Sequence, residues 1–191
     1  MRKMHSHQQW RKRVLEKETT GLIVIDIQGK LARVVDDSEG MISQCEKLIQ
    51  GCQVLGLPVL WLEQNPQRLG STVEELRTLQ TQPVFEKFTF DGCKDAHFAQ
   101  ALAQSGIQHW LVCGIETHIC VYQTVQSLIA LGYQAHVVSD CVSSRSKESK
   151  ALALNKMTQL GAKTTNVEMC LYEILQDCRA PEFKSILQLI K

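Results

Sequence analysis

The sequence predicts an α/β protein: a three-layer α/β/α sandwich around a mainly parallel, doubly wound sheet of about six strands. Short, continuous apolar runs such as Gly21–Ile27 are typical of strands buried on both faces. Between these runs lie amphipathic segments such as Ser38–Leu55, whose apolar residues recur at steps of three and four. Because the two kinds of segment alternate, we expect parallel βαβ units with helices on both faces of the sheet.

The individual elements follow from the same patterns, and right-handed crossovers between the strands make the predicted fold Rossmann-like. Strands are expected at Gly21–Ile27, Pro58–Leu62, Val84–Phe88, Ile107–Ile115, Tyr133–Ser139 and Lys163–Asn166. Helices are expected at Ser38–Leu55, Asp95–Gln104, Ser146–Leu160, Val167–Gln176 and Glu182–Ile190, and directly after Cys120. A capping-box pattern at Ser71–Glu74 predicts one more short helix.

Length and composition favour one ordinary globular domain. The 191 residues fit an extension at 1–19 followed by a single domain at 20–191. The net charge of +1 gives no strong field for nucleic acid or an anionic membrane, and no apolar run approaches the ~20 residues of a membrane span. The eight cysteines show no C-x-x-C spacing, which fits a reduced, cytoplasmic chain better than a disulfide framework.

The segment Trp110–Val121 carries the most specific chemical signal. An apolar run ends at Gly114, a polar turn follows, and Cys120 begins a new run with helical spacing. Such a thiol lies at the carboxyl end of a strand, where ligands bind in open α/β sheets. The unpaired N–H groups of a helix N-terminus also favour a thiolate and a developing oxyanion. Cys120 is therefore a candidate nucleophile, with a buried structural cysteine as the alternative.

Two charged residues stand at the ends of other predicted strands. Asp26 ends an apolar strand, where a carboxylate is costly unless it is paired or used; the alternatives are a general base and a turn or N-cap aspartate. Lys87 lies among aromatic residues before a loop, and it is either a solvated charge or a cation that keeps Asp26 ionised. If all three side chains meet, they form a nucleophile, a base and an electrostatic partner.

The sequence lacks the motifs of the common phosphate-binding and nucleotide-binding sites. The turn after the first predicted strand contains a single glycine, Gly29, and neither a G-x-G-x-x-G nor a Walker A pattern occurs. A cysteine phosphatase would need an arginine six residues after its cysteine, where this chain has Gln126.

The three motifs resemble the isochorismatase-like cysteine hydrolase superfamily, and most closely its isochorismatase domain-containing branch. The matching segments are Val24–Gln28 around Asp26, Phe85–Phe88 around Lys87, and Gly114–Val121 around Cys120, together with Glu63–Pro66, Val137–Arg145 and Pro181–Lys184. The resemblance covers the chain from about Thr20 to Lys191.

The resemblance implies a homo-oligomer in the cytoplasm, a catalytic triad of Asp26, Lys87 and Cys120, and a cis peptide between Ile115 and Glu116. It also implies that the backbone N–H groups of Glu116 and Cys120 form an oxyanion hole. Relatives that bind a metal have histidines after the second strand; here Glu63–Pro66 contains none, so no metal and no other cofactor are expected. His5 and His7 lie in the extension.

The resulting hypothesis is a metal-independent cysteine hydrolase of a small amide or ester-like substrate, which acts through a thioester on Cys120. Neither nucleic acid nor membrane is an expected partner. An oligomeric protein that keeps the fold without turnover, or that responds to oxidation, is the alternative. The expected pocket residues are Gln28, Gln64, Phe88, Thr117 and His118.

Overall fold

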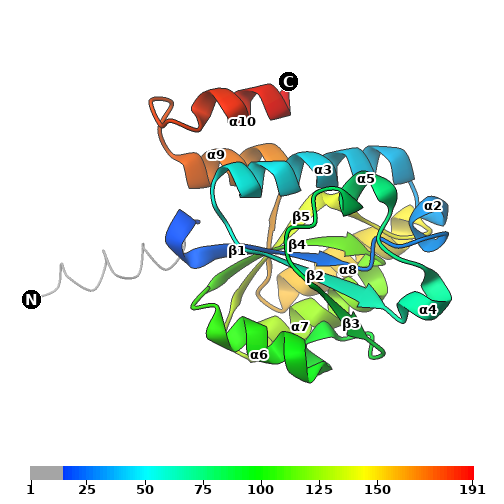
Figure 1. The fold of residues 1–191 in the computed structure, drawn as a ribbon. Coiled ribbons are helices and arrows are strands. Elements are labelled where there is room, and N and C mark those ends of the chain that lie inside the picture. Colours follow the sequence, from blue (N-terminus) through cyan, green and yellow to red (C-terminus); the bar gives the residue numbers. More distant parts are fainter. Residues whose placement is uncertain (1–14) are drawn as a thin grey trace, which may run out of the picture.

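A computed structural model describes residues 15–191 and has one sheet of six parallel strands (Figure 1). The strand order is β3-β2-β1-β4-β5-β6, so the predicted fold class is confirmed. The strands are β1 (Thr20–Ile25), β2 (Val59–Gln64), β3 (Val84–Lys87), β4 (His109–Ile115), β5 (Gln134–Ser143) and β6 (Lys163–Thr165). From β1 the chain adds strands first on one side of the sheet (β2, β3) and then on the other (β4, β5, β6). In such sheets, ligands bind at this switch point between β1 and β4.

Helices form a layer on each face of the sheet (Figure 1). The layer drawn above the sheet contains α3 (Ser38–Val54), α5 (Glu74–Arg77), α9 (Val167–Leu175) and α10 (Phe183–Ile190). The layer below contains α6 (Ala96–Gln104), α7 (Tyr122–Ala130) and α8 (Lys147–Gln159). Short turns complete the set: η1 (Lys17–Thr19), α2 (Leu31–Val34), α4 (Pro66–Leu69), η2 (Gly92–Lys94) and the π-helical turn η3 (Thr117–Val121).

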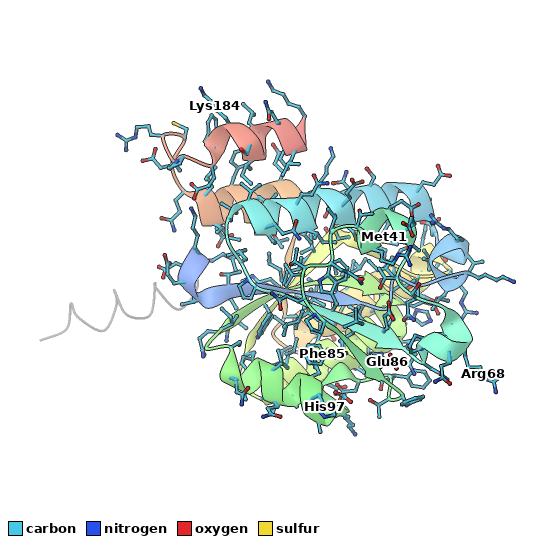
Figure 2. The ribbon with its side chains drawn as sticks, viewed as in Figure 1. Met41, Arg68, Phe85, Glu86, His97 and Lys184 are labelled. Carbon is cyan, nitrogen blue, oxygen red and sulfur yellow. The ribbon has the colours of Figure 1, made fainter. Side chains whose placement is uncertain are left out.

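Two apolar cores fill the space between the sheet and its helix layers. Every residue of β1 and of β4 is buried, as expected of strands covered on both faces. Met41 of α3 belongs to the upper core, and Phe85 of β3 packs on the lower core, where its ring meets Phe98 of α6 edge to face (Figure 2). Leu15 is also buried in the upper core, and its N–H donates to Glu173. Between residues 15 and 191, no helix is both long and apolar enough to cross a membrane.

Most predicted elements differ from the structure by one or two residues at their ends, with three larger differences. Strand β5 continues to Ser143, because its end pairs with β4 beyond a shift in register. The helix after Cys120 is preceded by the turn η3, which already contains that cysteine. The short helix predicted from Ser71–Glu74 is present as α5, but the capping box is wrong: the N-cap is Val73, and no side chain caps this helix.

Gly114 lets β4 lie directly against β1 beside the switch point. Its φ is +129°, and an added Cβ would stand 2.0 Å from the backbone oxygen of Ile25. We expect Gly114→Ala to lower the free energy of unfolding by about 3 kcal/mol, because the new methyl group collides with backbone that cannot move aside. Urea denaturation measures this change.

Gly132→Ala is the matched control: Gly132 also has a positive φ of +91°, but an added Cβ meets nothing within 4 Å, so the cost should be only about 1 kcal/mol. Equal losses in both variants would contradict the collision.

Candidate functional site

The carboxyl ends of four neighbouring strands bring the predicted triad to one edge of the sheet. Lys87 ends β3, Asp26 follows β1, and Cys120 follows β4 within η3. Because all strands are parallel and the order is β3-β2-β1-β4, these ends lie side by side with the end of β2 between two of them. The site therefore spans the topological switch point between β1 and β4.

Lys87 and Asp26 form a buried ion pair. The Nζ of Lys87 lies 2.7 Å from Oδ2 of Asp26, and both residues are 1% exposed. The ammonium also donates to Oε1 of Gln64 at 2.8 Å and to the backbone oxygen of Thr89 at 3.3 Å. An ammonium has three protons, so these three acceptors satisfy it completely. A charge that is buried and fully paired in this way is stable in place, whereas an unpaired one would be very costly.

Asp26 has an unusual backbone and one unused oxygen. Its φ is +54°, a left-handed conformation in which few non-glycine residues occur and which is often found at functional sites. Among residues 15–191, Oδ1 of Asp26 has no hydrogen-bond partner although it is buried. Burial raises the pKa of this carboxyl, and the charge of Lys87 opposes the rise. A carboxylate with a raised pKa and a free oxygen is suited to accept a proton.

Cys120 is 7% exposed and close enough to the ion pair for the charges to act on its thiol. Burial and the negative charge of Asp26 raise the pKa of Cys120 to about 12, while Lys87 lowers it. Burial thus opposes the thiolate that the helix N-terminus is expected to favour, and that expectation stays a prediction. A buried thiol with a raised pKa needs a base to act as a nucleophile.

The turn that carries Cys120 is held by backbone and side-chain bonds. The peptide between Ile115 and Glu116 is cis, at the predicted position. The backbone oxygen of Glu116 accepts hydrogen bonds from the N–H groups of Ile119 and Val121, which closes η3. The carboxylate of Glu116 is buried and accepts from both the backbone N–H and the Nε of Arg145, at 3.1 and 3.0 Å. The oxyanion hole assigned to Glu116 and Cys120 stays a prediction.

The five expected pocket residues have different environments. Gln28 is buried, and its amide bonds the backbone at Gln64 and Gly70, so it braces the loop after β2. Gln64 contacts Lys87 directly. Phe88 is 74% exposed and follows Lys87 in the chain.

The other two lie in η3. Thr117 is buried, and its hydroxyl has no partner within residues 15–191. His118 is half-buried, and its Nδ1 lies 2.9 Å from the hydroxyl of Ser144. The two residues tied to this turn, Ser144 and Arg145, were not predicted site residues. Their place after β5, at the same sheet edge, was the available signal.

The segment that contains no histidine begins within β2. Its first residue, Glu63, uses Oε1 to accept from the N–H and the hydroxyl of Thr72. No group of three or more metal-binding side chains occurs within residues 15–191, whereas His5 and His7 lie outside the described residues.

Comparisons with known proteins agree with this architecture. The model of the isochorismatase domain family matches residues 20–169. The chain is 33% identical to isochorismatase domain-containing protein 2A from Mus musculus, over 91% of this chain and 84% of the relative. A solved structure described as MAR1 ribonuclease from Caenorhabditis elegans is 32% identical, with a TM-score of 0.88 over 93% of this chain and 92% of the other.

A more distant structure shares the fold. The YcaC gene product from Escherichia coli, described as an octameric hydrolase of unknown specificity, is 21% identical with a TM-score of 0.88, over 93% of this chain and 89% of the other. The family match covers most of the chain and includes all three residues of the predicted triad. From the motifs, the parallel sheet and these similarities together, it follows that the chain belongs to the isochorismatase family, alongside the isochorismatase domain-containing proteins.

Proposed function

We propose that the protein is a metal-independent cysteine hydrolase that cleaves a small amide or ester-like bond through a thioester on Cys120. The observation that carries this proposal is the buried Lys87–Asp26 pair at 2.7 Å, whose second carboxylate oxygen has no hydrogen-bond partner of good geometry among residues 15–191, with the Cys120 thiol close enough to interact with Asp26. A purely structural ion pair would not require a thiol beside a carboxylate oxygen that has no hydrogen-bond partner among residues 15–191.

In the proposed first half-reaction, Asp26 takes the proton from Sγ of Cys120 as the sulfur attacks the carbonyl carbon. The N–H groups of Glu116 and Cys120 hold the resulting oxyanion. The protonated Asp26 then donates that proton to the leaving amine or alcohol as the C–N or C–O bond breaks, which leaves a thioester.

In the second half-reaction, Asp26 takes a proton from water as the water oxygen attacks the thioester carbon. The C–S bond then breaks, the carboxylic acid departs, and the proton returns to the sulfur. Throughout the cycle, Lys87 stays charged and stabilises the anionic form of Asp26, since its three protons are all directed at fixed oxygens. This assignment gives Lys87 an electrostatic role and no proton transfer.

The direct test is a panel of small amides and esters with intact-mass analysis and product detection. We expect a covalent acyl adduct and turnover in the wild type, and loss of both in Cys120→Ala, because no other group on the site can form the thioester. Cys93→Ala is the matched control: burial also raises the pKa of Cys93 to about 12, so it is a similar thiol outside the triad. Normal turnover by Cys120→Ala would overturn the mechanism.

A role without turnover, or one that responds to oxidation, is supported less well. The high pKa of Cys120 leaves little thiolate at neutral pH, and redox-sensing cysteines are usually exposed thiols of low pKa. Absence of any adduct across the panel, combined with a reversible disulfide from Cys120 after peroxide treatment, would favour the redox role instead.

RNA is a distinct possibility because a related nematode structure is described as a ribonuclease. We propose a small carbonyl substrate instead, since a thiol and a carboxylate are suited to acyl transfer, and the net charge of +1 provides little attraction for phosphates. Incubation with labelled RNA should leave it intact; cleavage that disappears in Cys120→Ala would reverse this assignment.

Homo-oligomerisation and a cytoplasmic location are further parts of the proposal. The octameric description of a protein with the same fold supports the first, and the eight cysteines, all present as thiols, support the second. Light scattering of the purified chain measures the oligomeric state, and fractionation of its source cells measures the location.

A further inference from the structure

The ammonium of Lys87 is held by one charged and two neutral acceptors. The charged acceptor is Oδ2 of Asp26 at 2.7 Å, and the stronger neutral one is Oε1 of Gln64 at 2.8 Å. The third, the backbone oxygen of Thr89, is longer at 3.3 Å. Because the ammonium is buried, the loss of either short bond leaves a proton without an acceptor where water cannot easily replace it. The Gln64 amide therefore helps to fix the orientation of the Lys87 ammonium group.

The orientation of the Gln64 amide is itself fixed from both ends. Its Nε2 donates to the backbone oxygen of Phe88 at 2.9 Å, which leaves Oε1 to face the ammonium. A lysine only donates, so the reverse orientation of the amide would place two donors together. The backbone of Gln64 is held as well: its N–H donates to Oε1 of Gln28, and its oxygen accepts from Nε2 of the same residue.

One amide thus connects the triad with the loop that follows β3. The backbone oxygens of Phe88 and Thr89 bond Gln64 and Lys87 respectively, while the side chains of Phe88 and Phe90 are 74% and 54% exposed. The loop backbone faces inward to the cation and its aromatic rings face outward. A movement of this loop would therefore change the acceptors around Lys87 through Gln64.

We propose that Gln64 is a positioning residue, which holds the Lys87 ammonium on Asp26 and joins it to the loop at Phe88. This role rests on the proposed hydrolase function, because it acts only through Lys87 and Asp26. The separate expectation that Gln64 contacts substrate stays a prediction.

The test measures how fast iodoacetamide alkylates Cys120 as a function of pH in the full-length protein, followed by peptide mass analysis. This readout needs no substrate. Methionine has about the size of glutamine but offers no oxygen, so in Gln64→Met the Lys87 ammonium loses one acceptor. Lys87 is then held less firmly and acts less strongly on Asp26 and Cys120. We expect about tenfold slower alkylation at pH 8, the effect of a rise of one pKa unit, and a profile displaced toward higher pH.

Gln53→Met is the matched control, because the Gln53 amide also donates to a loop oxygen, that of Leu79 at 2.7 Å, away from the site. The control should leave the Cys120 profile unchanged. If Gln64→Met does not fold, Gln64→Asn serves instead: the shorter side chain keeps an amide but withdraws its oxygen from Lys87 without adding a charge, and the profile should again move to higher pH.

The outcomes separate the inference from the function on which it rests. If Asp26→Asn and Lys87→Met change the Cys120 profile but the Gln64 variants do not, the positioning role is wrong. If none of these variants changes the profile, the triad itself is not assembled around Cys120, and the proposed function fails with it.

Discussion

Asp26→Asn is expected to lower turnover by about 10²–10⁴-fold while making Cys120 easier to ionise. Turnover falls because an amide cannot accept the proton of the thiol. The thiol ionises more readily because the substitution removes the negative charge of Asp26, which adds to burial in raising the pKa of Cys120, and leaves Lys87, which lowers it. The asparagine oxygen can still accept from Lys87, so the fold should be retained.

The opposite directions of the two effects make this variant informative. The catalytic rate is measured on any substrate found in the panel, and the pKa of Cys120 is measured from the pH dependence of its alkylation. In the wild type that pKa should be near 12. A variant that loses turnover with an unchanged alkylation profile would show that Asp26 supports the fold but does not face the thiol. Asp95→Asn, at the N-cap of α6, is the control for a half-buried aspartate lost elsewhere.

Lys87→Met is expected to lower turnover at pH 7 by about 10²-fold or more and to displace the pH profile upward. Burial raises the pKa of Asp26, and Lys87 is the main influence that opposes the rise. Without the ammonium, Asp26 avoids an unpaired buried charge by keeping its proton. A protonated carboxyl cannot act as a base, so activity should reappear only as the pH rises through the new, higher pKa.

The same variant tests the electrostatic contribution to Cys120. Removal of Lys87 should raise the pKa of the thiol, opposite to the effect of Asp26→Asn, because the cation is what lowers it. Rates at a series of pH values locate the acidic limb, and alkylation locates the thiol. Lys94→Met, in η2, is the control for loss of an exposed cation. If the acidic limb of the pH–rate profile of Lys87→Met lies at the same pH as in the wild type, the proposed role of the ion pair is wrong. Thermal denaturation must accompany both variants, since breaking a buried pair typically costs about 3–5 kcal/mol.

The fold and much of the site could be predicted from local patterns in the sequence. Apolar runs such as that of β1 reflect burial on both faces. The recurrence of apolar residues at steps of three and four located the helices to within a few residues. Asp26, Lys87 and Cys120 stood out because each is a chemically expensive or reactive group at the end of such a run. The resemblance to a known family then grouped them, and the strand order places them at one edge of the sheet.

The energies of the site could not be predicted in this way. Position in the chain suggested a thiolate at Cys120, whereas burial and the negative charge of Asp26 raise its pKa to about 12 against the opposing influence of Lys87. Similarly, the pattern at Ser71–Glu74 suggested Ser71 as a helix cap, whereas the helix begins at Glu74 with Val73 as its N-cap. For Cys120, the loss of solvent that opposes the local preference arises only after folding.

The sequence by itself determined the parallel sheet, the order of its elements and the residue types available for chemistry, since burial on two faces leaves a direct mark on the pattern of apolar residues. Only the tertiary structure decided that Lys87 pairs with Asp26 across 61 positions of the chain, and that the Gln64 amide accepts from the same ammonium. The physical reason is that hydrogen bonds and desolvation depend on which strand ends become neighbours, and the pairing of strands joins segments that are far apart in sequence.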